Sequence, residues 1–276
     1  MYSTVIVPLD GSRLAETALR PGVDVASRTG AEILVLSVVH DRSQEDARQS
    51  YLRTLTDQTT TVPVRYVVTL GAEPAAVIAD MAVEQDPSIV CMSTHGRGGF
   101  ARALLGSVAE DVVRRTAGPV LLMGPHTRAD LSPVAGQLMV CLDGSDHAEA
   151  ILPLATAWAQ QFAMELYLVQ FLDPHTARQL RVAKVPDEDI HEDAYLARVG
   201  RRLRDNGVPV DWEVLHDSRP AAAIVDHARH HEASLIALST HGRVGLRRLA
   251  IGSVAAQIVH DSPYPTLAIR PNSPDA

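Results

Sequence analysis

Short apolar runs alternate along the first half of the chain with longer segments in which apolar residues recur at helical spacing. The apolar runs predict strands, most of them buried on both faces, at residues 4–9, 33–39, 62–68, 88–92 and 119–123. The intervening segments predict helices at residues 12–30, 42–60, 75–81 and 108–113. Strands that alternate with helices imply a parallel sheet with right-handed crossovers. The expected fold class is therefore α/β.

The same order of elements returns in the second half. Asp143 matches Asp10 at an offset of 133 residues, and Gly242 matches Gly96 at an offset of 146. The second copy is therefore longer, and its polar, acidic insertion is expected to extend the second helix. A repeat of this length indicates two whole domains rather than a solenoid. We expect domain 1 at residues 1–125, a linker at 126–136 and domain 2 at 137–271.

Composition narrows the class of protein. The chain has 276 residues, 46% of them hydrophobic, and no apolar run approaches the ~20 residues of a membrane span. The net charge of −8 argues against nucleic acid as a partner. The first residues lead directly into a strand without a basic segment, so we expect no signal peptide. Cys91 and Cys141 lie in apolar strand patterns and are expected to be buried free thiols in a reducing cytoplasm.

A glycine-rich loop follows the fourth strand and carries the most specific signal. It runs from Ser93 through Gly96 and Arg97 to Gly106 and Ser107, where a helix begins. Glycine allows close approach of a ligand, and a helix N-terminus offers free N–H groups and positive potential to a phosphate. A tight turn without a ligand would look similar. The loop recurs in the second half, where nine residues separate Gly242 from Gly252 as nine separate Gly96 from Gly106. A simple turn needs no such fixed spacing.

The repeated loop resembles the universal stress protein family in its tandem form. ATP-binding members carry G-x2-G-x9-G-[S/T]; this chain matches from the second glycine onward, with Ser93 and Ser239 in place of the first. The resemblance covers nearly all of residues 1–271. It implies two tandem Rossmann-like domains, similar to the adenine nucleotide alpha hydrolases. Each would have a five-stranded parallel sheet with helices on both faces, and the nucleotide would lie across the carboxyl ends of the strands.

The resemblance also implies which residues bind the nucleotide. In the first copy these are Pro8, Leu9, Asp10, Val38, Met92, Ser93, Gly96, Arg97, Gly106, Ser107 and Val108. In the second they are Cys141, Leu142, Asp143, Phe171, Leu238, Ser239, Gly242, Arg243, Gly252, Ser253 and Val254.

These residue types suit such a ligand. A carboxylate accepts hydrogen bonds from ribose hydroxyls or the adenine amino group, and arginine pairs with phosphate. The alternatives are an aspartate that only starts a turn, a solvated arginine, and Ser107 and Ser253 as helix caps.

The histidines and tryptophans invite other interpretations. His95 and His241 lie in the loops without an obvious nucleophile–base partner, so we expect no acid–base catalysis from them. His227, His230 and His231 have helical spacing that could chelate a metal. With no further ligand evident in the sequence, an exposed helix face is expected and no metal site is predicted. Trp158 and Trp212 are expected in the core or at an interface.

The sequence therefore predicts a cytoplasmic protein that binds ATP, with Mg²⁺ as its companion, at one site per domain. Its role would be regulatory, in stress response and through an unknown protein partner, without enzymatic turnover. Phe171 and Cys141 replace Val38 and Pro8 in the second copy, so unequal sites are expected. One alternative is a nucleotide-free protein-interaction scaffold of the same fold. Another, an adenylating enzyme, lacks the Ser-Gly-Gly-x-Asp-Ser loop of such enzymes.

Assembly follows from the two fifth strands. In the family that the chain resembles, fifth strands commonly pair between domains, so residues 119–123 and 265–269 are expected to pair within one chain as a pseudo-dimer. Such pairing would satisfy edge groups that are otherwise exposed. Two such chains could associate as a homodimer.

Overall fold

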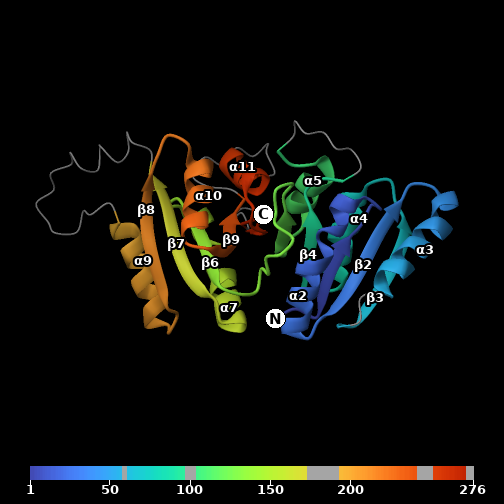
Figure 1. Ribbon diagram of the computed structural model, residues 1–276, viewed down its shortest axis with the longest axis horizontal. Coiled ribbons are helices and arrows are strands. Elements are labelled where there is room, and N and C mark those ends of the chain that lie inside the picture. The colour runs from blue at the N-terminus through green and yellow to red at the C-terminus, as the bar shows by residue number, and fades with distance from the viewer. Residues whose placement is uncertain (58–60, 97–103, 173–192, 241–250, 272–276) are drawn as a thin grey trace, which may run out of the picture.

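The computed structural model describes residues 1–57, 61–96, 104–172, 193–240 and 251–271. Two α/β lobes lie side by side and share one ten-stranded sheet (Figure 1), with the order β3-β2-β1-β4-β5-β10-β9-β6-β7-β8. Neighbouring strands within each lobe are parallel. The strands are β1 (Thr4–Pro8), β2 (Glu32–Val39), β3 (Val64–Leu70), β4 (Ser88–Ser93), β5 (Val120–Met123), β6 (Gln137–Leu142), β7 (Glu165–Leu172), β8 (Val210–His216), β9 (Ala233–Ser239) and β10 (Thr266–Ile269).

Helices cover both faces of the sheet, as expected for this class. One face carries a core with side chains from α2, α3, α7 and α9, and the other a core with side chains from α4, α5, α10 and α11. The first-half helices are α1 (Arg13–Glu16), α2 (Leu19–Thr29), the 3-10 helix η1 (Arg42–Gln44), α3 (Glu45–Thr56), α4 (Pro74–Glu84) and α5 (Ser107–Arg115). The second-half helices are α6 (Asp146–Glu149), α7 (Leu152–Phe162), α9 (Ala194–Asp205), α10 (Pro220–His230) and α11 (Ser253–Asp261).

Two sequence predictions about element boundaries need correction. The single helix predicted at 12–30 is two, α1 and α2, because Pro21 has no N–H to bond the carbonyl of Thr17. The third strand begins at Val64 rather than residue 62. Pro63 cannot donate to the ladder, and only its carbonyl is used, accepting from the N–H of Ile33. The predicted extension of the second-half helix by the acidic insertion falls on residues 173–192, outside the described residues.

The two lobes join through their fifth strands, as predicted. β5 and β10 pair antiparallel, with Leu121 opposite Leu267 and both side chains fully buried. One apolar core runs through this junction and includes residues of both halves. Trp158 is fully buried there, which confirms its expected place, and its indole Nε1 donates a hydrogen bond of 2.8 Å to the Tyr2 hydroxyl. Within the described residues, no helix is long and apolar enough to cross a membrane.

Candidate functional site

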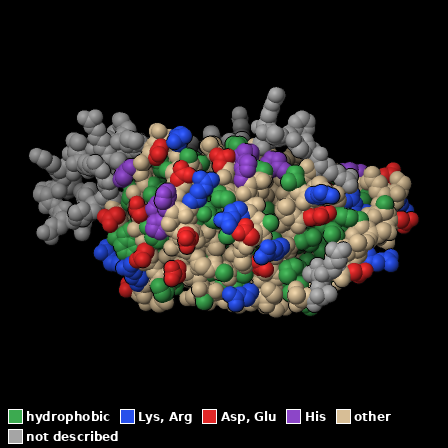
Figure 2. Space-filling view, in the orientation of Figure 1, with side chains coloured by type: hydrophobic (Ala, Val, Ile, Leu, Met, Phe, Trp, Pro, Cys, Tyr) green, Lys and Arg blue, Asp and Glu red, His purple; other side chains and the backbone are tan. Residues whose placement is uncertain are grey.

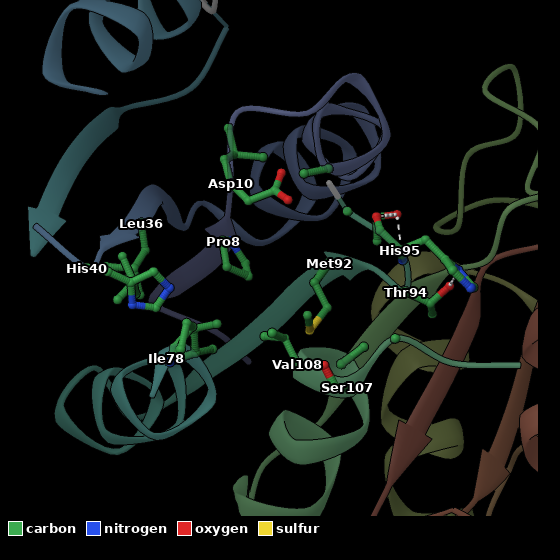
Figure 3. Close-up of a pocket in the computed structure, with 18 of the residues that line it drawn as sticks. Pro8, Asp10, Leu36, His40, Ile78, Met92, Thr94, His95, Ser107 and Val108 are labelled. Atoms are coloured by element: carbon green, nitrogen blue, oxygen red, sulfur yellow. Dashed lines mark hydrogen bonds between the residues drawn. The ribbon is translucent and has the colours of Figure 1, made fainter. Parts of the chain in front are cut away.

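A cavity of about 580 Å³ opens at the carboxyl ends of the first-half strands (Figure 3). It lies where the chain leaves β1 towards β2 and leaves β4 towards β5, the switch point at which open α/β sheets bind ligands. Ten residues predicted for the first copy line it together: Pro8, Leu9, Asp10, Val38, Met92, Ser93, Gly96, Gly106, Ser107 and Val108. Arg97 lies outside the described residues.

Asp10 and Gly96 face each other at one side of this cavity. The Oδ1 atom of Asp10 accepts a hydrogen bond of 2.9 Å from the N–H of Ser12, which helps to start the turn into α1. A Cβ atom at position 96 would lie only 2.3 Å from Oδ2 of Asp10. Glycine at this position therefore lets the loop pass without displacing the carboxylate. The turn-forming interpretation of Asp10 is correct, and its second oxygen still faces the loop.

The ends of the glycine-rich loop are fixed by backbone hydrogen bonds. The N–H of Thr94 donates to the carbonyl of Met123 at 2.9 Å, and the N–H of Gly106 donates to the carbonyl of Thr94 at 2.9 Å. A Cβ at position 106 would lie 2.6 Å from that Thr94 oxygen, so this glycine is also required by close approach. Ser93, which replaces the first glycine of the motif, turns its hydroxyl back to the carbonyl of His95 at 3.0 Å.

Helix α5 begins at the cavity wall. Its N-cap is Gly106, and no side chain caps it. The expectation that Ser107 caps this helix is therefore wrong, because Ser107 is already the first helical residue. The first N–H groups of a helix have no acceptor within it and carry the positive end of the helix dipole. Figure 3 shows Ser107 and Val108 across the cavity from Asp10, so these donors face a space that suits an anion.

The opposite end of the cavity is apolar. Leu36 and Val38 of β2, Ile78 of α4 and Met92 line it. Figure 3 shows Leu36 and Ile78 on the side of the cavity away from His95. His40 adds a polar side chain at the rim. This wall suits a flat aromatic group.

The second half repeats the loop geometry. The N–H of Thr240 donates to the carbonyl of Ile269 at 2.9 Å, and the N–H of Gly252 donates to the carbonyl of Thr240 at 2.8 Å. Gly252 is the N-cap of α11, so Ser253 is likewise not a cap. Asp143 holds its turn through Ser145 as Asp10 does through Ser12. His241, Gly242 and Arg243 lie outside the described residues.

The other predicted residues of the second copy occupy matching positions. Cys141, Leu142, Phe171, Leu238, Ser239 and Val254 lie at or beside the carboxyl ends of β6, β7 and β9 or in the first turn of α11. Val254 and its counterpart Val108 are each 38% exposed.

A comparison with known families agrees with this duplicated geometry. The model of the universal stress protein family matches the chain twice, over residues 1–123 and 136–270. The chain belongs to the universal stress protein family.

Individual relatives cover the chain to different extents. A universal stress protein of Mycobacterium tuberculosis (strain H37Rv) is 29% identical over 195 residues, which is 68% of this chain and 63% of the relative. The chain thus spans less than two thirds of that relative's length. A universal stress protein of Thermus aquaticus is 31% identical over 143 residues, 48% of this chain and 97% of the relative. The crystal structure of a universal stress protein from Archaeoglobus fulgidus covers 98% of this chain with a TM-score of 0.73 and 18% identity, a likeness of fold.

Arg48 is a residue of this universal stress protein's cavity that the sequence analysis missed. It lies on α3, is only 9% exposed, and its guanidinium sits 5.6 Å from the centre of the Tyr51 ring. The signal was present in the spacing, because residue 48 shares a helix face with Leu52 and Leu55. A charged residue on the buried face of a helix needs a partner or a ligand. Gln44, Pro74, Thr94 and His95 also line the cavity and were not predicted.

The two universal stress protein domains differ at this position. Tyr51 donates to Glu16 at 2.8 Å. Tyr195 takes the corresponding place in the second half, where burial and then the charge of Glu149 raise its pKa. Three residues before Tyr195 the sequence has Glu192, outside the described residues, where the first half has Arg48. At the position of the cationic cavity residue Arg48, the second copy therefore has the acidic residue Glu192 in its sequence.

The three histidines at the end of α10 meet their predicted environment only in part, since His230 is exposed as expected. The exposed helix face expected for them is wrong for His227, whose side chain is only 12% exposed. It lies with His231 and Glu213, and one ligand atom from each of the three residues falls within 4.8 Å of the others. His230 instead places its Nδ1 atom 2.7 Å from the backbone carbonyl of Asp226.

Proposed function

We propose that this universal stress protein binds ATP, accompanied by Mg²⁺, in the first-half cavity and at the matching place in the second half. The nucleotide would act as a regulatory ligand in stress response rather than as a substrate for sustained turnover. The single observation that carries the proposal is the arrangement across the first cavity. At one side Asp10 lies against Gly96, where any side chain would displace the carboxylate, and the open N-terminus of α5 stands at the other.

The cavity has room and chemistry for each part of such a ligand. Its volume of about 580 Å³ falls in the usual range for small-molecule sites. Adenine would lie against the apolar wall of Leu36, Val38 and Ile78. A ribose hydroxyl would donate to Asp10. The phosphates would then reach the N–H groups of Ser107 and Val108, and Mg²⁺ would be held mainly by phosphate oxygens and water.

Two observations favour a regulatory ligand over a reaction. The imidazole Nδ1 of His95 lies 2.9 Å from the hydroxyl of Thr94, so the ring is engaged within its own loop. His95 also lies edge-on to His260 of the second half, with 6.2 Å between the ring centres. Nucleotide in the first cavity would therefore act on a loop that touches the other domain.

Three matched variants test the proposal by calorimetric titration with ATP and Mg²⁺. Val108→Glu places a negative charge at the exposed start of α5, where it suits the helix dipole but repels phosphate. Val254→Glu does the same in the second half. Val83→Glu is the control, because Val83 is 69% exposed on α4 and does not line the cavity.

We expect wild type and Val83→Glu to bind ATP with the same affinity. Val108→Glu should bind ATP at least about tenfold more weakly at one of the two sites, which corresponds to a loss of about 1.4 kcal/mol of binding free energy. Val254→Glu should remove the other, weaker site. Equal binding by all four proteins would place ATP elsewhere. Absence of binding by wild type would leave the interaction scaffold as the better interpretation.

A further inference from the structure

His227 of α10, the C-cap residue His231 and Glu213 of β8 converge on the outer part of the second half. His227 and His231 are four residues apart, so their side chains lie on one helix face a turn apart. Glu213 lies on the edge strand β8, two residues before Leu215, which packs into the same apolar core as Ile224 of α10. Figure 2 shows histidine side chains (purple) at the surface on the β8 and α10 side of the molecule.

The distances are those of a chelating set. One nitrogen or oxygen from each of the three residues lies within 4.8 Å of the other two. The Nε2 atom of His227 is 3.6 Å from Oε2 of Glu213. This Nε2 atom is buried and has no hydrogen-bond partner among the residues that the structure describes, which is a costly state for a polar atom. A bound cation would supply the missing interaction.

Tyr167 of β7 holds the set in place. Its hydroxyl donates a hydrogen bond of 3.1 Å to Oε2 of Glu213. Its ring lies 4.3 Å from the His231 ring and 5.6 Å from the His227 ring, measured between centres. Hydrogen bonds to ligating carboxylates of this kind orient them towards a metal.

The first half serves as an internal comparison. The 146-residue offset that relates Pro74 to Pro220 relates Val67 to Glu213, Met81 to His227 and Gln85 to His231. Val67 and Met81 pack in an apolar core there. Leu34 pairs with Arg65 in the first half. Their counterparts, Tyr167 and Asp211, pair in the second half, so the strand register is the same in both halves. Equivalent backbone positions thus hold apolar side chains, Val67 and Met81, in the first domain. In the second domain they hold potential metal ligands, which Tyr167 supports.

We propose that Glu213, His227 and His231 bind one Zn²⁺ ion, with a fourth coordination position open to solvent. Two imidazoles and one carboxylate form a ligand set that Zn²⁺ favours, and three protein ligands leave one place for water. The ion would clamp the end of α10 to the edge strand β8. The site is separate from the nucleotide position, because Pro220, the counterpart of cavity residue Pro74, lies roughly 16 Å along the helix from His231 at 1.5 Å per residue.

Metal titration of the full chain tests the site. Chelator-treated protein is titrated with Zn²⁺ against a chromophoric competitor, without nucleotide, and with Co²⁺ to record the visible spectrum of a tetrahedral site. The variants are Glu213→Gln, His231→Ala and Tyr167→Phe. His230→Ala is the control, because that ring faces its own helix backbone. Circular dichroism of each metal-free variant checks that the fold is kept.

We expect wild type and His230→Ala to bind one Zn²⁺ and to melt at a higher temperature with the ion. Glu213→Gln and His231→Ala should bind at least about a hundredfold more weakly, and Tyr167→Phe about tenfold more weakly. The proposal is overturned if wild type binds no Zn²⁺, or if His230→Ala weakens binding as much as His231→Ala does. If Glu213→Gln does not fold, the Zn²⁺ affinity of His231→Ala, compared with that of His230→Ala, still tests the proposal.

Discussion

The indole of Trp158 in the second half donates its hydrogen bond to the hydroxyl of Tyr2 in the first. Both side chains are buried, and their rings meet edge-on with 6.4 Å between centres. Together with the pairing of β5 and β10, this contact makes the duplicated chain one body with a shared core. The strands β4 and β9, which lead into the two glycine-rich loops, are thereby parts of one sheet.

Loss of this hydrogen bond is predicted to weaken the whole chain. Trp158→Phe leaves the Tyr2 hydroxyl buried without its partner, so the free energy of unfolding should fall by about 1–3 kcal/mol beyond the packing loss. Tyr2→Phe removes the other partner, and the double variant should cost less than the sum of the two. Urea denaturation of the three variants and wild type measures this coupling. Strictly additive losses would show that the bond contributes nothing.

The glycines that cap the two loop helices are predicted to tolerate alanine unequally. A Cβ at position 106 would lie 2.6 Å from the Thr94 carbonyl oxygen, whereas a Cβ at position 252 would lie 3.4 Å from the Thr240 oxygen. Gly106→Ala must displace backbone and should cost about 1–3 kcal/mol of unfolding free energy. Gly252→Ala should cost under about 1 kcal/mol. Thermal or urea unfolding of the two variants compares them, and a larger loss in Gly252→Ala would contradict the geometry.

The contact between Gly96 and Asp10 predicts a defect of binding rather than of folding. Gly96→Ala would push against the Asp10 carboxylate, which is the end of a side chain and can turn aside. We expect ATP affinity to fall about tenfold, with a small change in melting temperature. Gly118→Ala is the control, because its Cβ would meet only the Ser88 carbonyl at an ordinary 3.8 Å. Unchanged ATP affinity in Gly96→Ala would remove Asp10 from the proposed site.

The two thiols are predicted to react slowly. Burial raises the pKa of Cys141 to about 12 and also raises the pKa of Cys91. Few thiolates therefore exist at pH 8, and modification by a thiol reagent should be slow and should speed up as pH rises. In the unfolded chain a cysteine thiol has a pKa of about 8.5. Above that pH the unfolded chain loses thiol protons that the folded chain keeps, so the free energy of unfolding should fall as pH rises.

Cys141 also reports on the second nucleotide site. In a Cys91→Ala variant it is the sole thiol of the chain. Saturating ATP should slow its modification further, because Cys141 occupies the place of cavity residue Pro8. Cys141 is partly exposed, so rapid stoichiometric modification of the folded protein at pH 8 would contradict its raised pKa. A rate indifferent to ATP would argue against nucleotide in the second half.

Sequence periodicity was sufficient for the fold because strand burial and helix spacing are local properties. The runs at 88–92 and 119–123 became central strands. The pairing of the two fifth strands was expected from the family resemblance, and the structure adds the register, with Leu121 opposite Leu267. The resemblance to the universal stress protein family, carried by the repeated loop, implied ten residues that the first cavity brings together.

Contacts between distant elements were beyond such local patterns. Arg48 enters the cavity because α3 lies against the end of β2. Glu213 meets His227 only through the packing of α10 on an edge strand. The spacing of the histidines therefore pointed to two possible metal ligands, but the sequence did not reveal the third, Glu213.

Photolabelling with 8-azido-ATP, followed by mass-spectrometric mapping, tests the central claim most directly. We predict light-dependent labelling of segments at the apolar wall, residues 36–44 or 74–81, which excess ATP suppresses and Val108→Glu abolishes. Labelling confined to other segments, or labelling that excess ATP does not suppress, would contradict an adenine site between β2 and α4.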